Sequence, residues 1–151
     1  MPSSARVLVV ANRTAATAAL RAAVADRAAR GPASFHLVVP ASPHGMHRVV
    51  DPDVAGREEA AARLEEALPL LEEAGGSEVT GEVGTADPLA AIMDAVHHRG
   101  FDEIILSTLP RRISRWLRVD LPSKARGLGL PVTHVEVPDA GIPTEDSLAA
   151  V

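Results

Sequence analysis

The stretch GEVGTADPLAAIMDAVHHRGFDEIILST, residues 81–108, carries the clearest fold signal in the chain. Asp87 and Pro88 supply an N-cap and a proline at the first helical position, so a helix is predicted from here to Arg99. The glycine that follows accepts the left-handed backbone with which helices commonly end. The next run, Asp102–Ser107, is almost continuously apolar. Strand, helix, glycine and strand in this order predict a crossover between two parallel strands.

The same order of elements extends along most of the chain. Four helical stretches alternate with five apolar runs, and a glycine follows each helix, at positions 31, 75, 100 and 127. Nearly continuous runs of Val, Leu and Ile are typical of parallel strands buried on both faces. We therefore predict an α/β fold in which an open parallel sheet of five strands lies between two helical layers. The predicted strands are Arg6–Ala11, Phe35–Pro40, Glu78–Val83, Asp102–Ser107 and Pro131–Val137, and the predicted helices are Thr14–Arg30, Arg57–Ala74, Asp87–Arg99 and a fourth that ends near Arg126.

Length and composition limit the classes of function. A chain of 151 residues, 46% apolar and 23% charged, suits one compact domain, which we place at residues 1–138, with a polar tail at 139–151. The absence of cysteine excludes disulfides, thiol catalysis and zinc–thiolate sites, and it favours a cytoplasmic location. No apolar run is long enough to span a membrane. A net charge of −5 argues against a general nucleic-acid binder.

Ligands of open parallel sheets bind beyond the carboxyl ends of the strands, so the residues that follow each strand are candidates. None of these turns carries a recognised catalytic or phosphate-binding motif, because G-x-G-x-x-G, G-x-x-x-x-G-K-[ST], G-x-S-x-G and H-E-x-x-H are all absent. A long loop is predicted at Ala41–Ala55, and it contains His44 and His47. Two histidines without a third ligand predict no metal site. His36 and His134 lie within predicted strands and are interpreted as sheet residues.

The segment Ser107–Arg126, STLPRRISRWLRVDLPSKAR, concentrates the positive charge of the chain. Residues 111–126 hold six cations and one anion, a net charge of +5, which leaves −10 for the remainder. Four apolar residues of this segment are spaced at i, i+3, i+4 and i+8, which predicts one apolar helical face. One interpretation is an amphipathic helix that packs on the sheet, and the other is an anion-binding or partner-binding surface. The apolar positions are Ile113, Trp116, Leu117 and Leu121.

Over residues 5–137 the chain resembles the universal stress protein family. The resemblance rests on the opening strand RVLVVANRT, on the pattern of residues 81–108 and on the closing strand LPVTHVEV. It implies a strand order of 3-2-1-4-5, with helices on both faces, in a fold similar to that of the adenine nucleotide alpha hydrolases. It also implies a ligand position between strands one and four. In such families the last strand commonly pairs across a dimer axis.

Nucleotide-binding members of that family carry G-x-x-G-x9-G-[ST] after strand four, where glycines let backbone amides approach the phosphates. The matching positions of this chain are Ser107, Pro110, Asp120 and Leu121, and all four depart from the pattern. Asn12 stands where such members keep an acid after strand one. The resemblance therefore predicts the fold together with the loss of the usual ATP-binding loop.

Three hypotheses about function follow. The first is a stress-related, non-enzymatic cytoplasmic protein without a cofactor, which acts by association, as a homodimer and with a protein partner that the sequence does not identify. The second is a divergent nucleotide or anion binder, with ATP or AMP as the ligand, in which Arg111 and Arg112 replace the glycine amides. The third is an enzyme, for which no nucleophile–base or carboxylate pair is placed. The candidate binding residues are Asn12, Arg13, Thr14, Val39, Ser107, Thr108, Arg111, Arg112 and Ser123, and the candidate dimer interface is Val132, Thr133, His134, Val135, Glu136 and Val137.

Overall fold

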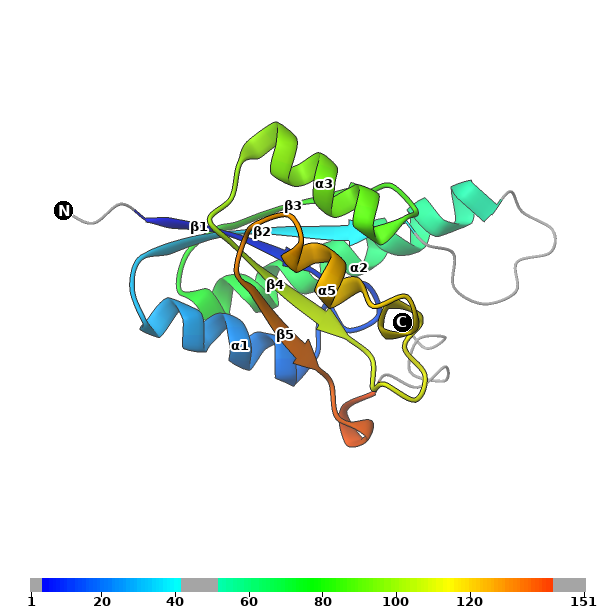
Figure 1. Cartoon of the computed structure of the whole chain (residues 1–151). Helices are drawn as coiled ribbons and strands as arrows, with labels where there is room; N and C mark the ends of the chain where they lie inside the picture. The colour runs from blue at the N-terminus through cyan, green and yellow to red at the C-terminus, as the bar shows by residue number, and fades with distance from the viewer. Residues whose placement is uncertain (1–3, 42–51, 143–151) are drawn as a thin grey trace.

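Five parallel strands form one sheet in the computed structural model, which describes residues 4–41 and 52–142 (Figure 1). The strand order is β3-β2-β1-β4-β5, and all four neighbouring pairs run parallel. This confirms the predicted fold class and the order that the family resemblance implied. The strands are β1 (Ala5–Val10), β2 (Ala33–Pro40), β3 (Val79–Gly84), β4 (Glu103–Thr108) and β5 (Val132–Glu136).

Helices cover both faces of the sheet. Side chains of α1 and α2 pack on one face, whereas α3 and α5 pack on the other, and Figure 1 shows α3 and α1 on opposite sides of the strands. No helix among the described residues is both long enough and apolar enough to cross a bilayer. The helices are α1 (Ala18–Ala29), α2 (Pro52–Gly75), α3 (Pro88–Arg99), α4 (Arg115–Arg118) and α5 (Leu121–Arg126), followed by the 3-10 turn η1 (Asp139–Gly141).

The central strand β1 supplies both hydrophobic cores. Successive side chains of a strand point to opposite faces, so Val7 and Val9 pack with α1 and α2, while Leu8 and Val10 pack with α3 and α5. All four side chains are completely buried. This double burial explains the uninterrupted apolar run in the sequence.

Several predicted boundaries differ from the structure. Helix α2 begins at Pro52, so the last four residues of the predicted loop 41–55 are helical, while residues 42–51, with His44 and His47, lie outside the described residues. Helix α1 begins at Ala18, because Thr17 is its N-cap and accepts a hydrogen bond from the amide of Leu20. The predicted start at Thr14 was therefore wrong by one turn.

The basic segment does not form the single helix that its periodicity predicted. It forms two short helices, α4 and α5, and Asp120 between them takes the left-handed conformation, with φ 52° and ψ 48°. Leu117 and Leu121 are nevertheless buried, as the apolar spacing required. The predicted tail begins with η1, whereas its residues 143–151 lie outside the described part of the chain.

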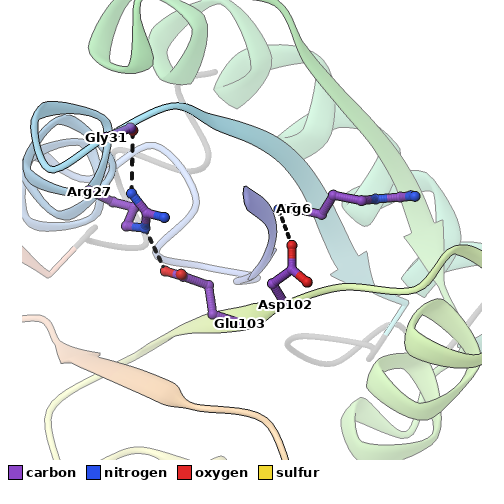
Figure 2. Close-up of polar contacts among 5 residues, drawn as sticks. All are labelled: Arg6, Arg27, Gly31, Asp102 and Glu103. Atoms are coloured by element: carbon purple, nitrogen blue, oxygen red, sulfur yellow. Dashed lines mark hydrogen bonds and ion pairs between the residues drawn. The ribbon is translucent and has the colours of Figure 1, made fainter. Parts of the chain in front are cut away.

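An ion pair and two hydrogen bonds fix the amino-terminal edge of the sheet (Figure 2). The guanidinium of Arg27, near the end of α1, donates through Nε to Glu103 of β4 over 2.8 Å and through Nη1 to the carbonyl of Gly31 over 3.4 Å. The Asp102 carboxylate accepts a hydrogen bond of 2.8 Å from the backbone amide of Arg6. These contacts tie α1 and β1 to β4, far from the edge where ligands of such sheets bind.

Glycine allows the helices to approach the edge strand β3 closely. A Cβ atom on Gly84 would lie 2.8 Å from Cβ of Ala91 in α3 and 2.9 Å from Cγ1 of Val38. Real Cβ atoms do not approach carbon so closely, so a larger residue here would push α3 away from the sheet.

His36 is a buried titratable group at the centre of β2, and the residue is only 4% exposed. Its Nδ1 lies 2.7 Å from Oγ1 of Thr80, and its ring stacks on Phe101 with 5.9 Å between centroids. Its Nε2 is buried without a hydrogen-bond partner among the described residues, and an oxygen of the Glu82 carboxylate, 3.7 Å away, is too distant to accept a hydrogen bond. Burial, and secondly the charge of Arg99, lower the pKa of His36 against the opposing effect of Glu82.

This burial predicts a loss of stability in acid. Because the folded state lowers the pKa of His36 below its ordinary value of 6.5, the unfolded chain takes up the proton first as the pH falls. The contribution of His36 to the free energy of unfolding should therefore be constant above pH 6.5. It should decline as the pH falls from 6.5 towards the pKa of His36 in the folded state. We expect His36→Phe, which keeps the ring stacking, to have a shallower acid decline in urea unfolding between pH 5 and pH 8. His134, whose pKa is also lowered by burial, remains in both proteins. Equal declines in wild type and variant would contradict the prediction.

Candidate functional site

A pair of buried hydroxyls joins the carboxyl ends of β1 and β4, where the family resemblance placed a ligand. Oγ1 of Thr14 lies 2.7 Å from Oγ of Ser107, and the two residues are only 2% and 1% exposed. Thr14 belongs to the turn between β1 and α1, and Thr17 fixes that turn through a hydrogen bond to the Thr14 carbonyl. Thr14 and Ser107 were both predicted, and the fold brings them into contact.

Asn12 links three elements at the same edge. Its amide Nδ2 donates a 2.8 Å hydrogen bond to the carbonyl of Pro40 at the end of β2, and its Oδ1 accepts from Nη1 of Arg63 in α2. Val39, which precedes Pro40, is completely buried. The side chain of Asn12 therefore already occupies a backbone acceptor of β2 at the edge where a bound molecule would be expected.

Arg63 is a site residue that the sequence reasoning missed. It lies on α2 among several other charged residues, and no spacing rule separates it from them. Its half-buried position lowers the pKa of its guanidinium, mainly through desolvation and further through the positive charge of Arg13. Glu59 and Glu66 act in the opposite direction.

Arg13 is the second cation at this edge. The residue is half-buried, and its Nε atom is buried without a hydrogen-bond partner among the residues that the structure describes. Sequence reasoning placed Arg13 among the binding candidates, and the structure sets it within electrostatic reach of Arg63.

The loop after β4 is directed towards β5. Oγ1 of Thr108 lies 2.8 Å from Nε2 of His134, and the backbone amide of Arg111 donates a 3.0 Å hydrogen bond to the Glu136 carboxylate. The side chain of Arg112 pairs with Asp139 at 3.1 Å, and both are largely exposed. Ser123 is exposed on α5.

Apart from the buried Val39 and the exposed Ser123, the predicted candidates divide into two groups. Asn12, Arg13, Thr14 and Ser107 gather at the ends of β1 and β4, together with the unpredicted Arg63. Thr108, Arg111 and Arg112 contact β5 and the segment after it. Within the described ranges no group of three histidine or acidic side chains could hold a metal ion.

The amino-acid sequence matches no protein-family model and no curated protein. Solved structures do match. A protein of the universal stress protein family from Burkholderia pseudomallei is similar with a TM-score of 0.62 and 20% identity, over 89% of this chain and 98% of its own.

Two further matches were solved with a nucleotide. The universal stress protein from Archaeoglobus fulgidus in complex with dAMP has a TM-score of 0.54 and 20% identity, over 89% of this chain and 99% of its own. A universal stress protein family protein from Arabidopsis thaliana with AMP bound has a TM-score of 0.55 and 12% identity, over 95% and 98%. At these identities the likeness shows that the chain has the universal stress protein fold.

The hydroxyl pair between β1 and β4 predicts an energetic coupling. Ser107→Ala should leave the Thr14 hydroxyl buried without a partner and cost about 1–3 kcal/mol of unfolding free energy. Thr14→Val should have a similar effect on Ser107. The double variant should lose less than the two single losses together, with a coupling of about 0.5–3 kcal/mol measured by urea unfolding. Additive losses would show that the two hydroxyls do not stabilise each other.

Proposed function

We propose that the chain is a divergent universal stress protein that acts by association rather than by catalysis, in a stress-related role in the cytoplasm. The likeness in fold to universal stress proteins supports the family assignment. The proposed mode of action rests on the loop after β4, which in nucleotide-binding relatives supplies the phosphate contacts.

The backbone amides of that loop are largely occupied from within the chain. Pro110 has no amide hydrogen, and the amides of Ile113 and Ser114 both donate to the Pro110 carbonyl, over 2.9 and 3.0 Å. The amide of Arg111 donates to the carboxylate of Glu136. A negatively charged side chain of the protein thus takes an amide position that a phosphate would need. This occupation supports a protein that does not hold ATP in the family manner.

A direct test compares nucleotides that differ only in phosphate number. Because the loop has few amides to offer, the additional phosphates of ATP should gain nothing, and ATP should bind no more tightly than AMP in calorimetry at low salt. The alternative function, a nucleotide binder that uses Arg111 and Arg112, predicts the opposite. In that case ATP should bind at least about tenfold more tightly than AMP, and Arg111→Ala with Arg112→Ala should abolish the difference.

Strand β5 is an edge strand of the sheet, and within the described residues no other strand pairs with its outer side, which suits the proposed homodimer. Backbone groups of Pro131 and Val137 bond to β4, which fixes the direction of the ladder. In a parallel pair the bonded residues alternate along the strand. The amides and carbonyls of Val132, His134 and Glu136 therefore point away from β4. An antiparallel copy of β5 could pair with these groups about a twofold axis at His134.

A matched pair of variants tests this dimer. His134→Ala and His134→Pro both remove the imidazole that contacts Thr108, but only the proline removes the outward amide hydrogen. Neither change removes a backbone bond to β4. We expect wild type and His134→Ala to sediment as dimers at micromolar concentration, and His134→Pro to sediment as a monomer with an unchanged circular dichroism spectrum. A monomeric wild type would overturn the proposed interface, whatever the nucleotide result.

A further inference from the structure

Arg13 carries a buried donor that none of the described residues satisfies. Its Nε is removed from solvent and has no hydrogen-bond acceptor among residues 4–41 and 52–142, although a guanidinium remains charged at every physiological pH. A buried donor of a charged group without a partner is destabilising, and native proteins contain few of them. The position is in the first turn after the central strand β1, at the ligand-binding edge of the sheet.

A second guanidinium lies at the same edge of the sheet and is held in place. Nη1 of Arg63 donates to Oδ1 of Asn12, and Nδ2 of Asn12 donates to the carbonyl of Pro40, so the orientation of Arg63 is fixed by β1 and β2 together. The charge of Arg13 is near enough to act on Arg63, and both side chains are half-buried. Two like charges in a partly desolvated position repel each other, and a bound anion would offset this repulsion.

The carboxylates near these arginines leave Nε of Arg13 without an acceptor. Glu59 and Glu66 both favour the charged form of Arg63, and Glu66 is exposed, so solvent screens its charge. Neither accepts a hydrogen bond from Nε of Arg13. The other cluster of arginines fits an anion less well, because Arg112 is paired with Asp139 and its side chain is 63% exposed.

We infer that Arg13 and Arg63 bind a phosphate group, either as free inorganic phosphate or as the terminal group of a phosphomonoester. The planar fork of a guanidinium matches the oxygens of a phosphate, and two arginines at the same edge of the sheet suit its double negative charge. The hydroxyl of Thr14 is hydrogen-bonded to Ser107, so the contacts that we propose for the phosphate come from the two arginines. This inference is independent of the proposed dimer, and it places the anion at the end of β1 rather than in the loop after β4.

The experiment measures binding of inorganic phosphate by calorimetry at low ionic strength. Wild type should bind with saturation at millimolar phosphate or below. Arg13→Gln and Arg63→Gln should each weaken binding about ten- to one-hundredfold, because each removes a charge-assisted contact. Arg111→Gln is the matched control, since it removes an exposed arginine at the same edge and should leave the affinity unchanged. Saturable binding that Arg13→Gln does not weaken, or that Arg111→Gln weakens equally, would overturn the inference.

Thermal unfolding separates a ligand role from a structural one. Without phosphate, Arg13→Gln should not lower the melting temperature, because it removes an unsatisfied donor. With phosphate, only wild type and Arg111→Gln should gain stability. Arg63→Gln also loses the contact with Asn12 and could be destabilised, so Arg13→Gln is the deciding variant. A marked loss of stability in phosphate-free Arg13→Gln would identify a structural arginine instead.

The same titrations identify the source of the phosphate. AMP that binds more tightly than inorganic phosphate, with the same sensitivity to Arg13→Gln, would identify a phosphomonoester as the ligand. Equal affinities would identify free phosphate. Absence of saturable binding for both would overturn the site.

Discussion

The fold depends on the burial of β1 on both faces and at both edges. Val7, Leu8, Val9 and Val10 are each completely inaccessible to solvent, because β2 and β4 flank the strand while helices cover it above and below. A strand in this position has no tolerance for polar side chains. Polar residues that could contact a ligand are therefore confined to the turn where the strand leaves the sheet. The first residues of that turn are Asn12, Arg13 and Thr14, which explains why the polar contacts of the candidate site begin there.

The carboxyl edge of the sheet shows how this fold satisfies its own polar groups. Asn12 donates a hydrogen bond to a carbonyl of β2, and Ser107 is hydrogen-bonded to Thr14. The Glu136 carboxylate accepts a hydrogen bond from the amide of Arg111. Each bond joins residues that are distant in the sequence and meet only because parallel strands end at one edge. At this edge the exception is Nε of Arg13, which is buried and has no acceptor in the described part of the chain. A buried donor without an acceptor, among polar neighbours that are hydrogen-bonded, indicates a ligand position better than a cluster of exposed arginines does.

Repeated local signals made most of the fold predictable. Strand runs, caps such as Asp87 and helix-ending glycines depend on the nearest few residues, and the structure reproduces the elements that they indicate. Two other features were not predictable. The left-handed Asp120 divides an apparently continuous helix, and Arg63 reaches Asn12 from 51 residues away. Periodicity cannot identify either, because it indicates neither the backbone conformation of a single residue nor the packing of α2 on β2 and β3.

The division of the two cores has a consequence for folding during synthesis. The core under α1 and α2 is built almost entirely from residues 7–79, so it can assemble as soon as β3 has been made. The core on the other face joins Leu8, Val10 and Val38 to residues of α3, β4 and α5, which are made later. Until those segments leave the ribosome, one side of the nascent three-stranded sheet is apolar and bare, and β1 has an unpaired edge. The half-made chain is therefore most prone to aggregation on the face that α3 and α5 finally cover.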